Sequence, residues 1–327
     1  MYQHTILVTG GLGFIGHNVV EKLRSDGHTV IVVDNQTDYS IIPADELTYI
    51  MKERRKRIGK GVTFYKNCIN DKRMHTIFKK HSPSIVIHLA SFPRQKVVNA
   101  NPQKGSNVMV EGMLNMLELS KEYGVTKFVY ASSSMVYGDF EDQVTEDAEC
   151  TPRGQYAIMK LTGEMLLKDY HRKYNLDYAI IRPSAVYGPY DVEDRVVSKF
   201  LLTAMRGETL QVNGESERLD FTYVDDIAAG FASIATSQEC HGTYNVTRSH
   251  ARSLLEIAEL SVATVGGGDI KVNDRDVEFP QRGELCIARA KKDFWFTPKV
   301  DTAEGIVLYY DWLQSSKYWQ ARLAKGE

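Results

Sequence analysis

The stretch Thr5-Ile-Leu-Val-Thr-Gly-Gly-Leu-Gly-Phe-Ile-Gly16 decides the fold of this chain. Its first five residues predict a strand, and the glycines lead into a segment, Gly16 to Arg24, with apolar residues at helical spacing. Glycines between a strand and a helix let the backbone approach a pyrophosphate at the positive end of that helix. The stretch therefore predicts a dinucleotide-binding turn rather than merely a tight turn.

A second apolar run, Val30 to Val33, ends at Asp34, close to the ~20-residue separation expected between the glycines and a ribose-binding acid. A carboxylate there can accept hydrogen bonds from a ribose diol and repels a 2′-phosphate. Asn35-Gln36-Thr37 supplies no adjacent cation. We therefore expect NAD as the cofactor, with these binding residues so far: Gly10, Gly13, Phe14, Ile15, Gly16, Asp34 and Asn35.

Further apolar runs alternate with helical segments through the first 180 or so residues, which predicts a doubly wound α/β fold of Rossmann type. The runs are Ile85 to Ile87, Phe128 to Tyr130 and Tyr178 to Ile181, and the helical segments include Val108 to Tyr123 and Tyr156 to Tyr174. Beyond Pro183 the pattern is less regular, with expected loops at 207–214, 266–268 and 280–283. We expect an NAD-binding domain at 1–182 and a smaller, mainly substrate-binding α/β region at 183–327, with about 220–248 returning to the first domain.

Composition narrows the class of protein. The 327 residues carry 40 basic and 42 acidic side chains, a formal charge of -2 that favours neither nucleic acid nor an anionic membrane as partner. The charged run 52–57 follows Pro43 within a predicted amphipathic helix and is expected to be a solvated face. Four widely spaced cysteines predict neither a disulfide framework nor a metal site. Without a leader-like or membrane-spanning segment, a cytoplasmic location is expected.

The middle of the chain carries the candidate chemistry. Tyr156 and Lys160 are four residues apart, so a helix places them on one face, where the cation can lower the pKa of the phenol. They follow Ser132-Ser133-Ser134-Met-Val-Tyr-Gly138, which comes just after the predicted strand Phe128 to Tyr130. The position of this pair after a strand distinguishes it from a chance match on an ordinary amphipathic helix.

The glycine spacing, the serine run and the Tyr-Lys pair together resemble the extended short-chain dehydrogenase/reductase family of nucleotide-sugar epimerases and dehydratases, including UDP-glucose 4-epimerase. The resemblance implies that Tyr156 takes the proton from the sugar 4-hydroxyl, that Lys160 tunes the phenol and holds the nicotinamide ribose, and that Ser133 bonds O4. His88-Leu89-Ala90 and the backbone of Ile69 are similar to family segments beside the cofactor. A homodimer through the two long helical segments is also implied.

The residues after Ser133 distinguish between reactions that share a 4-keto intermediate. The family's 4,6-dehydratases usually carry Asp-Glu there, whereas this chain has Ser134 and Met135. Epimerisation at C4 needs no further acid or base. The resemblance therefore favours a 4-epimerase of a nucleotide-diphosphate sugar, a UDP-hexose or UDP-hexuronate. A 4-dehydrogenase or 4,6-dehydratase remains an alternative, as does an NAD-binding sensor or scaffold without catalysis.

The substrate contacts are expected to come from both halves of the chain. Gln281-Arg282-Gly283-Glu284 and the stretch around Arg218 resemble family segments that grip the diphosphate, a task suited to charge-assisted hydrogen bonds. Ser132 and Ser134 are read first as packing or turn residues, although Ser134 lies beside the catalytic position. The candidate substrate-binding residues are Ser133, Ser134, Arg218 and Arg282.

Overall fold

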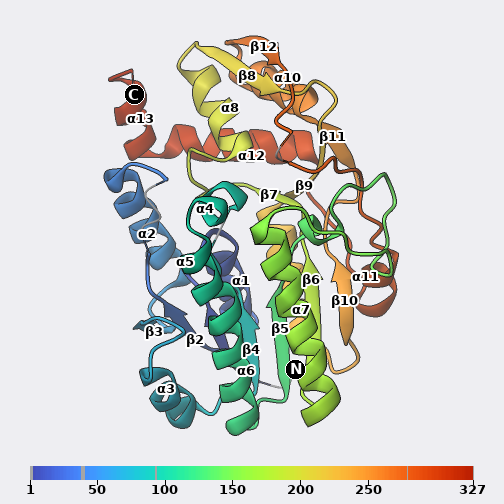
Figure 1. The fold of residues 1–327 in the computed structure, drawn as a ribbon. Helices are drawn as coiled ribbons and strands as arrows, with labels where there is room; N and C mark the ends of the chain where they lie inside the picture. Colours follow the sequence, from blue (N-terminus) through green and yellow to red (C-terminus); the bar gives the residue numbers. More distant parts are fainter. Residues whose placement is uncertain (1–2, 38–40, 93, 278, 327) are drawn as a thin grey trace.

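A seven-stranded parallel sheet forms the centre of the molecule (Figure 1). The computed structural model describes residues 3–37, 41–92, 94–277 and 279–326. The strand order is β10-β6-β5-β4-β1-β2-β3. Successive strands from β1 to β3 are added toward one side of the sheet, and those from β4 onward are added toward the other side, so the strand order reverses between β1 and β4. The strands are β1 (Thr5–Thr9), β2 (Thr29–Asp34), β3 (Thr63–Lys66), β4 (Ile85–His88), β5 (Lys127–Ala131), β6 (Asp177–Arg182) and β10 (Gly242–Asn245).

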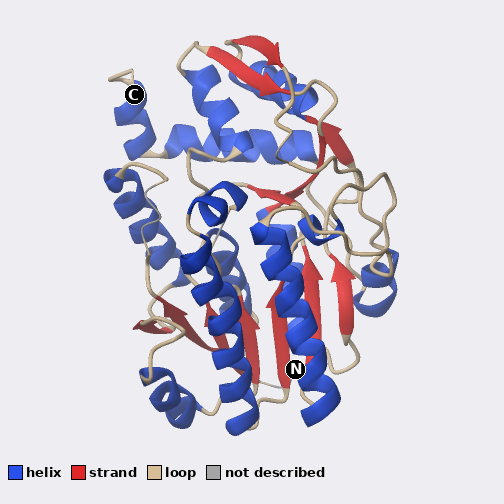
Figure 2. Cartoon of the chain, in the orientation of Figure 1, coloured by secondary structure: helices blue, strands red, loops and turns tan. Residues whose placement is uncertain are grey.

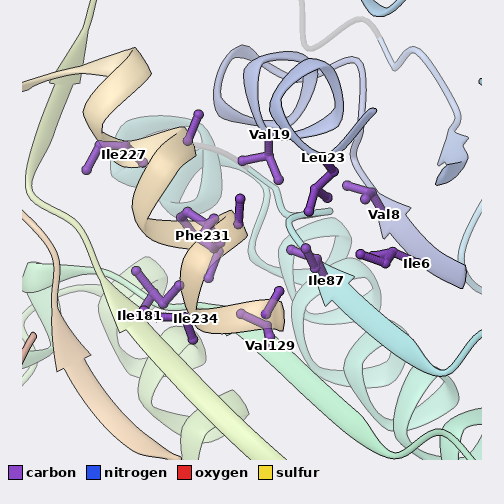
Figure 3. Packing of buried hydrophobic residues seen from close by; sticks show 14 of the residues in the cluster. Ile6, Val8, Val19, Leu23, Ile87, Val129, Ile181, Ile227, Phe231 and Ile234 are labelled. Atoms are coloured by element: carbon purple, nitrogen blue, oxygen red, sulfur yellow. The ribbon is translucent and has the colours of Figure 1, made fainter. Parts of the chain in front are cut away.

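Helices cover both faces of the sheet, as its nearly continuous apolar strands require. The apolar cluster on one face includes residues of α1 (Phe14–Ser25), α2 (Ala44–Ile58), α9 (Val224–Thr236) and α11 (Ala288–Phe294). Figure 3 shows part of this face, with Val19 and Leu23 of α1 and Phe231 and Ile234 of α9 lying against the strands. The other face is covered by α3 (Arg73–His81), α6 (Gly112–Glu122) and α7 (Gln155–Tyr174).

Short helical segments complete this part of the chain. α4 (Gln95–Ala100), α5 (Pro102–Ser106) and the π-helical turn η1 (Asn107–Glu111) lead into α6, and the 3₁₀ turn η2 (Ser134–Tyr137) follows β5. α4 packs against α7. These segments lie at the carboxyl edge of the sheet, where open α/β sheets bind their ligands.

A smaller α/β region stands over the same edge (Figure 2). It holds a three-stranded sheet and a two-stranded parallel pair around a separate apolar cluster. The strands are β7 (Ala185–Tyr187), β9 (Arg218–Tyr223) and β11 (Ala251–Ser253), with β8 (Thr209–Asn213) pairing β12 (Asp269–Asn273). The helices are α8 (Val196–Met205), α10 (Leu254–Val265), α12 (Thr302–Ser315) and α13 (Lys317–Leu323).

The doubly wound Rossmann-type fold with a smaller α/β region is confirmed. The expected loop at 207–214 is wrong, because residues 209–213 form β8, whose Leu210 and Val212 are buried in the smaller core. Its alternation of buried and exposed residues is the pattern of a half-buried strand. Within the expected returning segment 220–248, α9 packs on α1 and β10 joins the large sheet, whereas β9 belongs to the smaller region. None of the described helices is both long and apolar enough to cross a membrane.

A buried histidine lies where the central strands end. His88 is 1% exposed, and its Nδ1 is 2.8 Å from the Thr9 hydroxyl oxygen across the β1–β4 pair. Its ring stacks on Tyr130 of β5 with 6.0 Å between centroids. Burial, with a smaller effect from the Lys160 charge, lowers the pKa of His88 to about 3. His88 is therefore neutral in the folded protein at neutral pH.

The low pKa makes His88 a source of acid instability. In the unfolded chain the His88 imidazole has its ordinary pKa of 6.5, so it binds a proton below that pH, whereas in the folded protein it does so only near pH 3. The free energy of unfolding therefore falls as the pH falls from about 6.5 to about 3. We expect the free energy of unfolding of His88→Asn, which keeps a polar partner for Thr9, to fall by about 2 kcal/mol less than that of the parent when the pH is lowered from about 7 to about 5. Urea unfolding at both pH values measures this difference. His75→Asn, at an exposed histidine of α3, should keep the parent's pH dependence, and an unchanged dependence in His88→Asn would contradict the assignment.

Candidate active site

The glycine turn after β1 packs too closely against neighbouring backbone for Gly10 or Gly16 to carry a side chain. Gly10 has a φ of 68°, and a Cβ there would lie 2.7 Å from the Ala90 nitrogen. A Cβ on Gly16 would lie 2.1 Å from the Gly10 carbonyl oxygen. Gly13 donates to that carbonyl at 2.9 Å and caps α1, which begins at Phe14 and Ile15. The turn thus presents the amino end of α1 at the carboxyl edge of the sheet, as a pyrophosphate requires.

Asp34 ends β2 beside this turn. Its carboxylate accepts hydrogen bonds from the backbone N–H groups of Leu12 at 2.9 Å and Gln36 at 2.7 Å. Burial is the largest effect on its pKa and raises it. Each carboxylate oxygen can accept more than one hydrogen bond, so a ribose diol still finds acceptors there. Asn35 is exposed, and its side chain accepts from Thr37.

The remaining predicted cofactor residues follow the neighbouring strands. Leu89 donates to the Thr9 carbonyl at 3.1 Å and Ala90 to the Thr9 hydroxyl at 3.3 Å, which fixes the end of β4 beside β1. Ile69 follows β3, is 5% exposed and packs against Gly112, while its carbonyl accepts from Asn115. The crowded glycines and the buried acid at the end of β2 fit NAD, which these residues would hold across the strand-order reversal.

Arg54 is a residue of this site whose role the sequence did not predict. It belongs to the charged helix α2 but is 4% exposed, on the same helical face as Ile50. Its guanidinium donates to the Leu12 carbonyl at 3.1 Å and to the Tyr190 carbonyl at 2.7 and 3.1 Å. Its position on the apolar face was the available signal. Arg54 therefore ties the glycine turn to the loop that follows β7.

The three predicted catalytic residues lie together at the start of α7 and the end of β5. Lys160 is 4% exposed and donates to the Ala131 carbonyl at 2.7 Å, and its nitrogen lies 5.8 Å from the centroid of the Tyr156 ring. The same nitrogen lies 5.2 Å from the centroid of Tyr130. Ser133, whose hydroxyl accepts from the Met135 N–H at 3.2 Å, also acts to lower the pKa of the Tyr156 phenol.

Burial governs the protonation of this group. It raises the pKa of Tyr156 and lowers that of Lys160 to about 7. The cations that counter the shift at Tyr156 are Arg195 and Arg282. The net shift of the Tyr156 pKa is thus opposite in sign to the one that the Tyr-Lys spacing predicts, because burial outweighs the effect of the nearby cations. Tyr156 is therefore a protonated phenol surrounded by groups that would favour a phenolate.

A buried ion pair holds the helix that carries Tyr156 and Lys160. Glu164 on α7 accepts from Arg182 of β6 through both carboxylate oxygens, at 2.9 and 2.6 Å, and from the Ser132 hydroxyl at 2.5 Å. Glu164 and Arg182 are 0% and 2% exposed. Ser132 is thus a structural residue. Ser134 is fully buried, and its hydroxyl has no hydrogen-bond partner among the described residues, while Met135 beside it is buried and carries no ionisable group.

The two predicted substrate arginines line one cavity of about 670 Å³. Its other lining residues include Asp139, Phe140 and Asp142. Arg218 donates to Asp142 at 2.7 Å and to the Ala251 carbonyl at 3.2 Å. Burial lowers the pKa of Arg282 to about 10, and its Nε has no partner among the described residues. Arg282 is therefore the better placed of the two for an incoming anion.

Comparison with known proteins agrees with this geometry. The NAD dependent epimerase/dehydratase family matches residues 6–247. A UDP-glucuronate 4-epimerase of Thermodesulfobacterium geofontis is 31% identical over 94% of this chain and 95% of its own length. Mouse dTDP-D-glucose 4,6-dehydratase is 25% identical over 96% of this chain and 90% of its own.

A solved structure shares both the fold and the cofactor chemistry. The UDP-glucose 4-epimerase of Thermus thermophilus, in complex with NAD, superposes with a TM-score of 0.85 at 28% identity, over 95% of this chain and 99% of that one. The family match covers both the glycine turn and the Ser133, Tyr156 and Lys160 cluster. The chain belongs to the NAD-dependent epimerase/dehydratase family of enzymes that act on nucleotide sugars.

Proposed function

We propose that the protein is an NAD-dependent 4-epimerase of a nucleotide-diphosphate sugar, a UDP-hexose or UDP-hexuronate. One observation carries the proposal: Ser133, Tyr156 and Lys160 meet at the carboxyl edge of the sheet, beside a serine and a methionine where a dehydratase has its acid pair. These groups suit reversible oxidation at C4. The similarity to a UDP-glucuronate 4-epimerase supports the same reading.

The proposed mechanism assigns one task to each residue. Tyr156 accepts the proton of the sugar 4-hydroxyl, Arg195 and Arg282 favour the phenolate against the effect of burial, and Lys160 would hold the nicotinamide ribose. Ser133 bonds the same sugar oxygen and holds C4 in place. The glycine turn and Asp34 would hold NAD, which would supply reversible hydride transfer at C4. After the keto-sugar turns over in the site, Tyr156 returns the proton to the oxygen, which leaves C4 inverted.

We propose a matching division of the chain. Residues 1–182, together with a returning segment near 220–248, would hold NAD, and the rest of 183–327 would hold the sugar nucleotide. The position of β10 in the large sheet and of Arg218 and Arg282 around a shared cavity supports this division. In that cavity the two arginines would bind the diphosphate, while Ser134, beside Ser133 and outside the cavity lining, is proposed to bind the sugar.

Two competing functions are separated by their products. A 4-dehydrogenase or 4,6-dehydratase accumulates NADH or a dehydrated keto-sugar, whereas an NAD-binding sensor leaves every sugar unchanged. The test incubates the protein and NAD with UDP-, GDP-, CDP- and dTDP-sugars and follows products by proton NMR and NADH by absorbance. A new C4 epimer without net NADH is the expected result, and an unchanged panel would refute the proposal.

Removing the phenol should remove the chemistry and leave the fold intact. We expect Tyr156→Phe to lower the rate of epimerisation roughly 10²- to 10⁴-fold, because the proton then has no positioned acceptor. The matched control is Tyr170→Phe on the same helix, whose hydroxyl contacts Glu118 away from the site. Initial rates by NMR measure both variants. Equal rates for Tyr156→Phe and the parent would favour the sensor.

We also propose a homodimer built on α6 and α7. The two helices lie side by side on one face of the sheet (Figure 1). α7 exposes large apolar side chains, with Ile158 50% and Met165 64% exposed. A two-fold axis between the helices of two copies would bury both side chains in a four-helix bundle.

Charged side chains on the exposed apolar face of α7 should prevent dimerisation. We expect the double variant Ile158→Lys and Met165→Lys to sediment as a monomer at micromolar concentration while the parent sediments as a dimer, because burying two ammonium groups opposes association. The control is Val307→Lys on α12, which is also exposed and apolar. A monomeric parent would contradict the proposal.

A further inference from the structure

The side-chain nitrogen of Lys160 lies over an aromatic ring to which the proposed chemistry gives no task. Tyr130 of β5 is 2% exposed, and the centroid of its ring is 5.2 Å from the Lys160 nitrogen. At that distance the negative face of an aromatic ring attracts a cation, and the attraction is strongest where water is excluded. Lys160 is itself buried, so little water competes with the ring for its charge.

The other groups around Lys160 supply limited support for a buried charge. Its nitrogen has three donors when protonated, and it donates to the Ala131 carbonyl at 2.7 Å. Burial lowers the pKa of Lys160 to about 7, and Glu164 acts in the opposite direction. The carboxylate of Glu164 is engaged elsewhere, because Arg182 donates to both of its oxygens. The face of the Tyr130 ring is therefore a needed second support for the ammonium.

The Tyr130 ring is held in place from two sides. Its hydroxyl donates to the backbone carbonyl of Lys160 at 3.5 Å and lies against Gly163, where a Cβ would clash with the hydroxyl oxygen. On the sheet, Tyr130 pairs with His88 across β4 and β5, and the two rings stack with 6.0 Å between centroids at an interplanar angle of 18°. The absence of a side chain at Gly163 thus allows the phenol to reach the backbone of α7.

The same contacts continue to the strand that leads into the glycine turn. The His88 Nδ1 is 2.8 Å from the hydroxyl oxygen of Thr9, which also accepts from the Ala90 N–H at 3.3 Å. His88 is neutral at neutral pH, so it places no second positive charge beside the ring. Side chains of β1, β4 and β5 therefore form one packed row that ends at the Lys160 ammonium.

We propose that Tyr130 is a positioning residue whose ring face holds the Lys160 side chain in place and stabilises it as an ammonium. This inference rests on the proposed function, in which Lys160 would hold the nicotinamide ribose. A neutral amine would lose one hydrogen-bond donor and the attraction to the ring. Tyr130 thus acts on the reaction through Lys160 and not by touching the sugar.

The ionisation of Lys160 can be followed because its neighbours keep one charge state near neutral pH. The titratable and charged groups around it are His88 of β4, Tyr130 of β5, Arg182 of β6, and Tyr156 and Glu164 of α7. Burial lowers the pKa of the imidazole and raises the pKa of both phenols, so these three groups are neutral. The remaining two form the buried ion pair.

The test measures the pKa of Lys160 directly. NMR titration of protein labelled with ¹³C at the lysine ε-carbons, with Lys160→Met to assign the signal, is carried out with and without NAD. We expect Tyr130→Leu to lower the measured pKa by roughly one unit, and Tyr130→Phe, which keeps the ring, to retain the parent's value. The matched control is Phe128→Leu, because Phe128 is buried on the same face of β5 and also contacts the His88 ring.

The pH dependence of epimerisation gives a second readout. If the reaction needs the ammonium, the rate falls as the pH rises through the pKa of Lys160. We expect this basic limb to move to lower pH by roughly one unit in Tyr130→Leu, and to stay in place in Tyr130→Phe and Phe128→Leu. Initial rates by NMR from about pH 6 to about pH 9 measure the four profiles.

Two results would overturn the inference. An equal shift in Phe128→Leu and Tyr130→Leu would assign the effect to core packing, and an equal shift in Tyr130→Phe and Tyr130→Leu would assign it to the hydroxyl. If Tyr130→Leu fails to fold, pentafluorophenylalanine at this position keeps the shape of the ring but not its attraction for cations, and the same fall in pKa is expected. A parent that epimerises nothing, with the expected titrations, supports the role of Tyr130 toward Lys160 and refutes the proposed reaction.

Discussion

The buried ion pair between Glu164 and Arg182 is the interaction on which the candidate active site depends. It joins α7 to β6, and through the Ser132 hydroxyl it also reaches the end of β5. Those elements carry the Tyr156 and Lys160 pair and Ser133. Removal of either partner would leave the other charge buried and unpaired, which would lower the free energy of unfolding by about 3–5 kcal/mol. The pair therefore fixes where α7, with Tyr156 and Lys160, lies relative to Ser133.

The same geometry explains why two sites share one edge of the molecule. Parallel strands all end at the same edge, so the glycine turn after β1, Asp34 after β2 and Ser133 after β5 face the same space. The smaller α/β region stands over this edge and brings Arg218 and Arg282 to a common cavity. Neither half holds a full set of candidate residues. The candidate site exists because the chain passes between the two parts more than once.

Much of the large sheet follows from local patterns in the sequence. The apolar runs that end at Thr9, Val33 and Tyr130 each coincide with an observed strand, because buried parallel strands need continuous apolar residues. β3 and β8 escaped prediction, since both are half exposed and their hydrophobic content is low. The glycine turn and the Tyr156–Lys160 spacing were readable because their chemistry depends on residues close together in sequence. The role of Arg54 was not, because it arises from a contact with Tyr190, more than a hundred residues away in the sequence.

The bridge that Arg54 forms has a thermodynamic consequence. One guanidinium holds the carbonyl of Leu12 in the glycine turn and the carbonyl of Tyr190 in the loop that leads to Arg195. A ligand that restricts the motion of one carbonyl would reduce the conformational entropy that is lost at the other carbonyl when a second ligand binds there. Such coupling would make cofactor and sugar cooperative ligands, and reciprocity would then require each to raise the affinity of the site for the other by the same factor. In the proposed reaction, in which a keto-sugar turns over before it is reduced, this coupling would keep the intermediate bound together with its cofactor.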